Sequence, residues 1–144
     1  MQLTRSGEYG LKGVVFLAKQ SHKQFSFVSQ ISREVKIPEK FLAKIFQRLS
    51  KAGLLRSTRG ANGGFALGRP AKEITMKAVI EAIEGPIALN RCLLRQGECE
   101  EEQVCPLHGV LGEAQERFLE VLERTTMEDL VRETERKVGK GRRW

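Results

Sequence analysis

The sequence predicts a mainly α fold with a small β-hairpin wing: a winged helix-turn-helix domain followed by a long dimerisation helix. Three observations indicate it. Two short amphipathic segments are joined by a tight turn, a Gly-rich hairpin follows them directly, and a long segment with a narrow apolar seam occupies the second half. We therefore expect a winged helix-turn-helix domain over residues 1–85, a cysteine-containing loop over 86–108, and a dimerisation helix with a C-terminal tail over 109–144.

A first helix is expected from Leu3 to about Gln20, because apolar residues cover most of its circumference, as in a buried helix. Gly10 and Gly13 lie on one face of this helix. The missing side chains would let another helix approach closely at that face.

A helix-turn-helix should follow. Its first helix begins near Ser26, and its second runs from Pro38 to Ala52, with proline in a favoured first position. The spacing of apolar residues places five side chains of the second helix inward: Phe41, Leu42, Ile45, Phe46 and Leu49. The opposite stripe comprises Lys40, Lys44, Gln47 and Lys51. Such a stripe would face the major groove of DNA, where lysine favours guanine edges and glutamine favours adenine edges.

Residues 54–67 read as a β-hairpin with a loose Gly/Asn-rich tip, which after a helix-turn-helix is a wing. Arg59 and Asn62 at the tip suit phosphates or a narrow minor groove, and Arg56 would hold phosphates together with Lys51. The alternative is a loop that cradles a nucleotide phosphate. It is disfavoured because the Gly-x₄-Gly-Lys-Ser/Thr pattern is absent and no helix starts at these glycines.

The second half should be helical apart from its cysteine loop. Thr75 caps a helix that ends at Gly85, and a long helix runs from about Pro106 to Arg124. The narrow apolar seam of the long helix favours a dimer interface over packing within one chain. Thr126 and Asp129 resemble a capping box that opens a last short helix, and residues 139–144 form a basic tail.

Charge is divided unevenly along the chain, which carries a net +7 in all. Residues 1–72 hold 14 Lys/Arg and 3 Asp/Glu, a balance of +11, whereas residues 73–144 hold 11 and 15, a balance of −4. A basic N-terminal half indicates a polyanion-binding module. No apolar run approaches the roughly 18–20 residues of a membrane span and no secretory segment is recognisable, so we expect a cytoplasmic protein without a membrane partner.

All three cysteines, Cys92, Cys99 and Cys105, lie within 17 residues together with His108. Three thiols and an imidazole so close together suit an iron–sulfur cluster, zinc or copper(I). Buried, inert cysteines are the alternative, but these fall at no helical or strand period in a Gly- and Glu-rich segment. An odd cysteine count argues against a disulfide framework, and the two-residue gap of zinc knuckles is missing.

Four segments together resemble the family of winged-helix transcription regulators typified by the iron–sulfur regulator IscR and the nitric-oxide-sensing repressor NsrR. The match rests on residues 3–9, on 37–49, on the Arg-Gly-x-x-Gly-Gly-aromatic-x-Leu wing of 59–67, and on the cysteine loop. It covers nearly the whole chain. The wing pattern is the most specific of the four segments.

The resemblance implies a homodimeric regulator, not an enzyme, that binds palindromic double-stranded DNA. We expect an iron–sulfur cluster to control its operator affinity, so that it senses redox, nitric oxide or iron–sulfur status. It carries Cys92, Cys99 and Cys105 over as cluster ligands, with either His108 or the partner subunit's Glu8 as the fourth. We favour His108 because it is local, and we favour [2Fe–2S] over [4Fe–4S]. Two departures stand out: the first cysteine gap is six residues rather than five, and Ala43 replaces a glutamate of the IscR type in the recognition helix.

Two alternatives remain at this point. The same scaffold could serve a zinc- or thiol-based sensor. A less favoured reading is an iron–sulfur electron-transfer protein or redox enzyme, for which residues 26–67 would have no purpose and no organic-cofactor site is evident.

Overall fold

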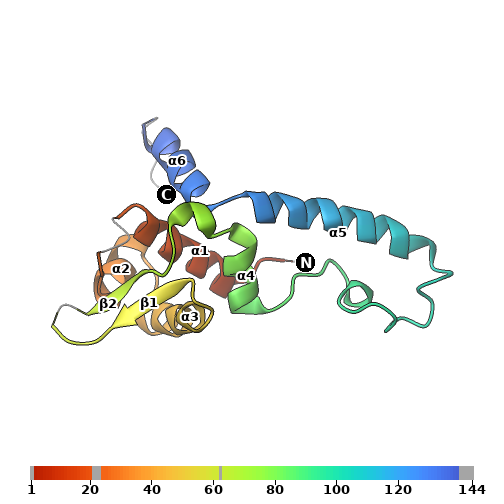
Figure 1. Ribbon diagram of the computed structural model, residues 1–144, viewed down its shortest axis with the longest axis horizontal. Coiled ribbons are helices and arrows are strands. Elements are labelled where there is room, and N and C mark those ends of the chain that lie inside the picture. Colours follow the sequence, from red (N-terminus) through yellow and green to blue (C-terminus); the bar gives the residue numbers. More distant parts are fainter. Residues whose placement is uncertain (1, 21–23, 62, 140–144) are drawn as a thin grey trace.

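The computed structural model describes residues 2–20, 24–61 and 63–139 (Figure 1). Its helices and strands are α1 Arg5–Ala18, α2 Val28–Val35, α3 Glu39–Lys51, β1 Leu55–Thr58, β2 Gly64–Leu67, the 3₁₀ turn η1 Ala71–Glu73, α4 Met76–Glu84, the 3₁₀ turn η2 Arg91–Leu93, α5 Pro106–Arg124 and α6 Met127–Val138. The expected mainly α fold with a two-stranded wing is confirmed. Bounds differ by at most a few residues from those the sequence predicts.

Helix α1 is the centre of the hydrophobic core and contacts α2, α3, α4 and α6. The expected close approach at its two glycines is confirmed. A Cβ atom on Gly13 would lie 2.6 Å from Cε1 of Phe46 on α3, and a Cβ on Gly10 would collide with Ile83 on α4. The glycines therefore let side chains of α3 and α4 pack directly against the backbone of α1, which fixes the position of α3.

Helices α2 and α3 form the helix-turn-helix. Lys36 takes a left-handed conformation after α2, and Pro38 is the N-cap of α3 rather than its first residue. Phe41 was expected to point into the core, but it is 59% exposed, so this prediction is wrong. Leu42 and the residues that follow it at helical spacing already fill the inward stripe, and Phe41 lies about 100° away from Leu42 around the helix.

The wing pairs β1 with β2 in antiparallel register, from Leu55 opposite Leu67 to Thr58 opposite Gly64. Ser26 was expected to start α2, but it adds a bridge to this sheet through two 2.9 Å backbone hydrogen bonds with Phe65. Gly64 has a φ of 128°, and a Cβ there would collide with the backbone of Ser26. Glycine is required at this position for the segment before α2 to lie against the wing.

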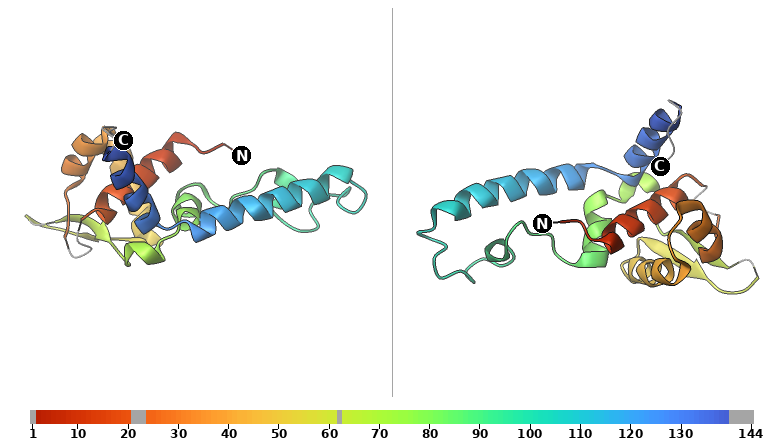
Figure 2. Two further views of the ribbon diagram at one scale, coloured as in Figure 1. Left: turned by 90° about the horizontal axis from the view of Figure 1, so that it is seen from above. Right: turned by 180° about the vertical axis from the view of Figure 1, so that it is seen from behind.

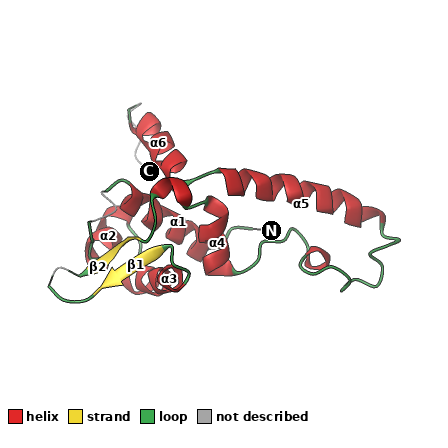
Figure 3. Cartoon of the chain, in the orientation of Figure 1, coloured by secondary structure: helices red, strands yellow, loops and turns green. Residues whose placement is uncertain are grey.

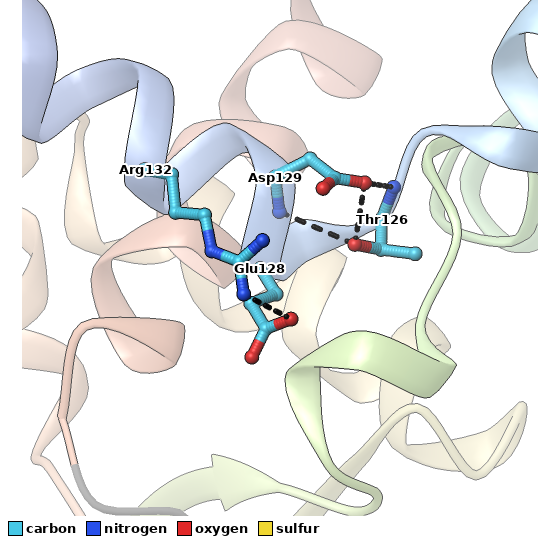
Figure 4. A network of polar contacts seen from close by, with 4 residues as sticks. All are labelled: Thr126, Glu128, Asp129 and Arg132. Atoms are coloured by element: carbon cyan, nitrogen blue, oxygen red, sulfur yellow. Dashed lines mark hydrogen bonds and ion pairs between the residues drawn. The ribbon is translucent and has the colours of Figure 1, made fainter.

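Backbone hydrogen bonds join the start of α4 to the junction between α5 and α6. Met76 N–H donates to the Thr125 carbonyl, and Met127 N–H donates to the Ile74 carbonyl, both over 2.8 Å. Helix α6 begins with the expected capping box, in which Thr126 and Asp129 satisfy each other's backbone N–H groups (Figure 4). These contacts anchor the C-terminal end of α5 to the winged domain.

Helix α5 extends away from the winged domain over most of its length in both views of Figure 2. The segment after α4 runs alongside α5 away from the winged domain and then reverses direction to enter α5 at Pro106 (Figure 1). Leu89 N–H in this segment donates to Gln115 Oε1 of α5 over 2.9 Å. Among the helices of the described segments, none combines the length and the hydropathy that a membrane crossing requires.

Candidate nucleic-acid interface and cysteine loop

The outward stripe of α3 is cationic. Lys40, Lys44, Gln47 and Lys51 are all exposed, because the buried residues Leu42, Ile45, Phe46 and Leu49 occupy the opposite side of the helix. Arg48 does not join the stripe: its guanidinium donates to the Ile83 carbonyl over 3.0 Å and attaches α3 to α4. The stripe therefore sits on a helix that is fixed on its other faces.

The wing lies beside α3 (Figure 3) and carries the other predicted DNA-binding residues. Arg59 is exposed at the end of β1. Arg56 is more constrained, since its Nε donates to the Leu67 carbonyl over 3.2 Å and its guanidinium lies 5.0 Å from the centre of the Phe25 ring. The predicted site residue Asn62 lies outside the described residues.

An open groove of about 450 Å³ separates α3 from the wing. It brings together three residues predicted from sequence, Gln47, Lys51 and Arg59. The sequence did not lead us to expect the three hydroxyl residues that also line the groove, Ser50, Ser57 and Thr58. Ser50 could have been predicted, because it follows Gln47 by three residues and so lies on the same face of the helix. The groove thus combines two cations with hydroxyl and amide groups, which is the mixture that binds phosphodiester backbones.

The cysteine loop joins α4 to α5. Cys92 lies in η2, Cys99 in a turn, and Cys105 is the N-cap residue of α5. All three are free, half-buried thiols. Within residues 2–20, 24–61 and 63–139, the side chains of histidine, cysteine, aspartate and glutamate form no group of three that could hold a metal ion. The structure thus places the thiols in one loop without assembling them into a site.

The two candidates for a fourth ligand have different surroundings. His108 lies in the first turn of α5; its Nε2 is 3.6 Å from Oε1 of Glu102, and its Nδ1 is buried without a hydrogen-bond partner. Glu8, in the first turn of α1, pairs with Lys12 over 2.8 Å, and the hydrogen bond and charge of Lys12 lower the pKa of its carboxyl group. Three free thiols and an unpaired buried imidazole nitrogen match the donors of an iron–sulfur cluster or zinc.

Helix α5 exposes a series of large apolar side chains. Leu107, Val110, Phe118 and Val121 are all exposed, and Val110 is 68% accessible. Only toward its C-terminal end does the helix bury a residue, Leu122, in the core. Exposed apolar faces of this kind mark contact surfaces for other macromolecules.

Comparisons with known proteins agree with this architecture. Residues 3–133 match Rrf2, a family described as iron-dependent transcriptional regulator. The HTH-type transcriptional regulator NsrR of Shouchella clausii is 36% identical over 132 residues, which are 91% of this chain and 89% of that protein. The structure of CymR, the global cysteine regulator of B. subtilis, is similar with a TM-score of 0.78 and 29% identity, covering 93% of this chain and 98% of that one. T. potens IscR shares the fold, with a TM-score of 0.74 and 23% identity over 92% of this chain and 88% of its own.

Proposed function

The chain belongs to the Rrf2 family of DNA-binding transcriptional regulators, and from this premise we propose that it is a homodimer whose operator affinity depends on an iron–sulfur cluster. The resemblance to IscR and NsrR inferred from the sequence is confirmed, as is the expectation of a regulator rather than an enzyme. The observation that carries the DNA-binding part of the proposal is the groove where α3 and the wing bring Gln47, Lys51 and Arg59 together.

In this proposal α3 enters the major groove of the operator. Lys40, Lys44 and Gln47 contact base edges from the exposed stripe. Lys51, Arg56, Arg59 and Asn62 hold the phosphate backbone, and each phosphate contact adds to the salt dependence of binding. Arg56 contributes the least in the described geometry, because its guanidinium already has partners in the wing.

Two substitutions separate these roles. Lys51→Ala should weaken binding to all DNA sequences and reduce the slope of log K against log salt by about 1. Lys44→Ala should instead weaken operator binding by about 1–3 kcal/mol and relax the preference for the operator over other sequences. Lys72→Ala is the control, because Lys72 is an exposed lysine in η1, an element that contacts α6. Equal affinities for all four proteins would contradict the interface.

The proposed dimer forms through α5. Four large apolar side chains on this helix are exposed in the described chain, and a second copy of the helix would cover them. A two-fold dimer places the two α3 helices about 34 Å apart, one turn of DNA, and therefore favours a palindromic operator.

The cysteine loop supplies the sensor. Cys92, Cys99 and Cys105 would hold the cluster, and the cluster would supply a redox- and nitric-oxide-sensitive centre. We favour His108 over the partner subunit's Glu8 as the fourth ligand, because Glu8 is already paired with Lys12 whereas His108 Nδ1 has no partner. Binding of the thiolates would give the loop at the N-terminal end of α5 one conformation, and so favour one arrangement of the two DNA-binding domains.

Anaerobic absorption and Mössbauer spectra test the ligand set. We expect a brown wild-type protein with a [2Fe–2S] spectrum, an altered or unstable centre in His108→Ala, and a wild-type spectrum in Glu8→Ala. The reverse pattern in the two variants would assign the fourth ligand to Glu8. Colourless anaerobic protein without iron would contradict the cluster.

A second candidate is zinc- or thiol-based sensing on the same DNA-binding scaffold. It is favoured by the three free, half-buried thiols and by the likeness to CymR, the global cysteine regulator of B. subtilis. Colour and metal content distinguish the two: bound zinc in a colourless protein, or DNA affinity that follows thiol oxidation without any metal, supports this candidate over the cluster.

A further inference from the structure

The imidazole of His108 faces a carboxylate through one nitrogen and has no polar partner at the other. Nε2 lies 3.6 Å from Glu102 Oε1, and Nδ1 is one of two buried side-chain nitrogen or oxygen atoms without a partner among the described residues. We propose that Glu102 is a positioning residue that accepts a hydrogen bond from His108 Nε2–H and leaves Nδ1 as the atom that binds the metal centre. This inference rests on the proposed function, in which His108 is a ligand.

The contact is in a protected part of the loop. The side chains of His108 and Glu102 are 23% and 22% exposed, so most of the surface of each is shielded from bulk water. The 3.6 Å separation lies just beyond a hydrogen bond, so the proposed bond requires a small rotation of one of the two side chains. A neutral histidine that donates through Nε2 carries its lone pair on Nδ1, which is then the only ring atom able to bind a metal.

Glu102 is itself held in place by the loop. Its second oxygen, Oε2, accepts a hydrogen bond from Gly97 N–H over 2.7 Å. Gly97 takes a φ of 83°, which directs its N–H without the strain that a side chain would add there. One carboxylate thus joins the segment between Cys92 and Cys99 to the first turn of α5, where His108 lies.

Carboxylates perform this role in many metalloproteins. A ligating histidine usually donates its other N–H to a carboxylate or carbonyl, which fixes the ring orientation and raises the basicity of the ligating nitrogen. Loss of such a partner typically costs 10–100-fold in metal affinity. Glu102 is distinguished from its neighbours Glu100 and Glu101 by being half-buried, whereas both neighbours are exposed.

The ligating atom is identified by pulsed EPR on the reduced protein reconstituted with iron and sulfide. The chain has only two histidines, so samples with ¹⁵N at either Nδ1 or Nε2 of histidine give simple spectra. We expect the strong nitrogen coupling to come from Nδ1 and to disappear in His108→Ala. Strong coupling from Nε2, or coupling that survives in His108→Ala, would overturn the assignment.

Three variants test the role of Glu102. Glu102→Ala should speed anaerobic transfer of the cluster iron to a chelator 10–100-fold and shift the reduction potential. Glu102→Gln keeps an acceptor oxygen and should restore most of the retention, and Glu100→Gln in the same loop should behave as wild type. Equal retention and potential in Glu102→Ala and wild type would contradict the positioning role.

The apoprotein provides a readout that does not require the cluster. The Hε2 proton of His108 should exchange slowly with water in wild type and Glu102→Gln, and fast in Glu102→Ala. Fast exchange in all three proteins would show that the contact does not form. If wild-type protein binds no cluster, the proposed cofactor fails and the Nδ1 assignment fails with it, while the proton exchange still decides the Glu102 contact.

Discussion

The close approach of α1 to α3 gives a prediction whose magnitude follows from the structure. In Gly13→Ala the new Cβ would lie 2.6 Å and 2.7 Å from two ring carbons of Phe46, and 3.1 Å from Cδ1 of Leu42. Carbon atoms normally rest about 3.5–4.0 Å apart, so the ring would have to move by about 1 Å. Phe46 is fully buried with its ring 5.1 Å from that of Phe65, so neighbouring core side chains resist this movement.

Overpacking of a core in this way costs about 1–3 kcal/mol, and the better helix propensity of alanine returns at most about 1 kcal/mol. Because the new Cβ meets two ring carbons at once, we take the upper part of that range, about 2–3 kcal/mol. We therefore expect Gly13→Ala to lower the free energy of unfolding by about 1–2 kcal/mol, measured by urea denaturation. Phe46→Leu should relieve the clash, so the double variant should be more stable than the sum of the two single effects predicts. A neutral or stabilising Gly13→Ala, or strict additivity with Phe46→Leu, would refute the reasoning.

Three further predictions concern the C-terminal helices. Thr126→Ala removes the N-cap of α6 and should lower the free energy of unfolding, measured by urea titration, by about 1 kcal/mol. Glu128→Gln removes only the exposed ion pair with Arg132 (Figure 4) and should cost no more than about 0.5 kcal/mol in the same titration. Hydrogen bonding from Arg136 is the main cause that lowers the pKa of Glu133 from 4.5 to about 2. The stabilising effect of the Glu133 carboxylate is therefore complete above pH 4.5 and is lost as the pH falls toward 2. The difference in melting temperature between wild type and Glu133→Gln should shrink over that range, and a difference that grows there would contradict the ion pair of Glu133 with Arg136. Val110→Glu places a charge on the exposed apolar face of α5 and should convert the proposed dimer to a folded monomer in sedimentation velocity, with Glu116→Gln on the same helix as control. A dimer in both variants would place the interface elsewhere.

Sequence reasoning succeeded where the signal is local. The capping box of Thr126 and Asp129 needs residues only three positions apart, and Pro106 marks the start of α5 because proline suits the first helical turn. The glycines of α1 were informative as well, since a face without side chains has few uses other than close packing.

Features that depend on tertiary pairing were missed. Ser26 reads as a helix start, but the wing recruits it into a β-bridge with Phe65. Phe41 fits the apolar period of α3 and yet is exposed, because neighbouring residues already fill the core. The contact between Glu102 and His108 arises from the path of the loop, which residue spacing does not determine.

Control of DNA binding by the cluster is tested by the affinity of one protein preparation for its own promoter DNA, measured before and after anaerobic removal of the cluster. We predict that holoprotein and apoprotein differ at least tenfold in Kd at a fixed salt concentration, and that Cys92→Ser protein behaves as apoprotein throughout. Identical Kd values for the two forms would contradict control of DNA binding by the cysteine loop, even if both forms bind the promoter tightly.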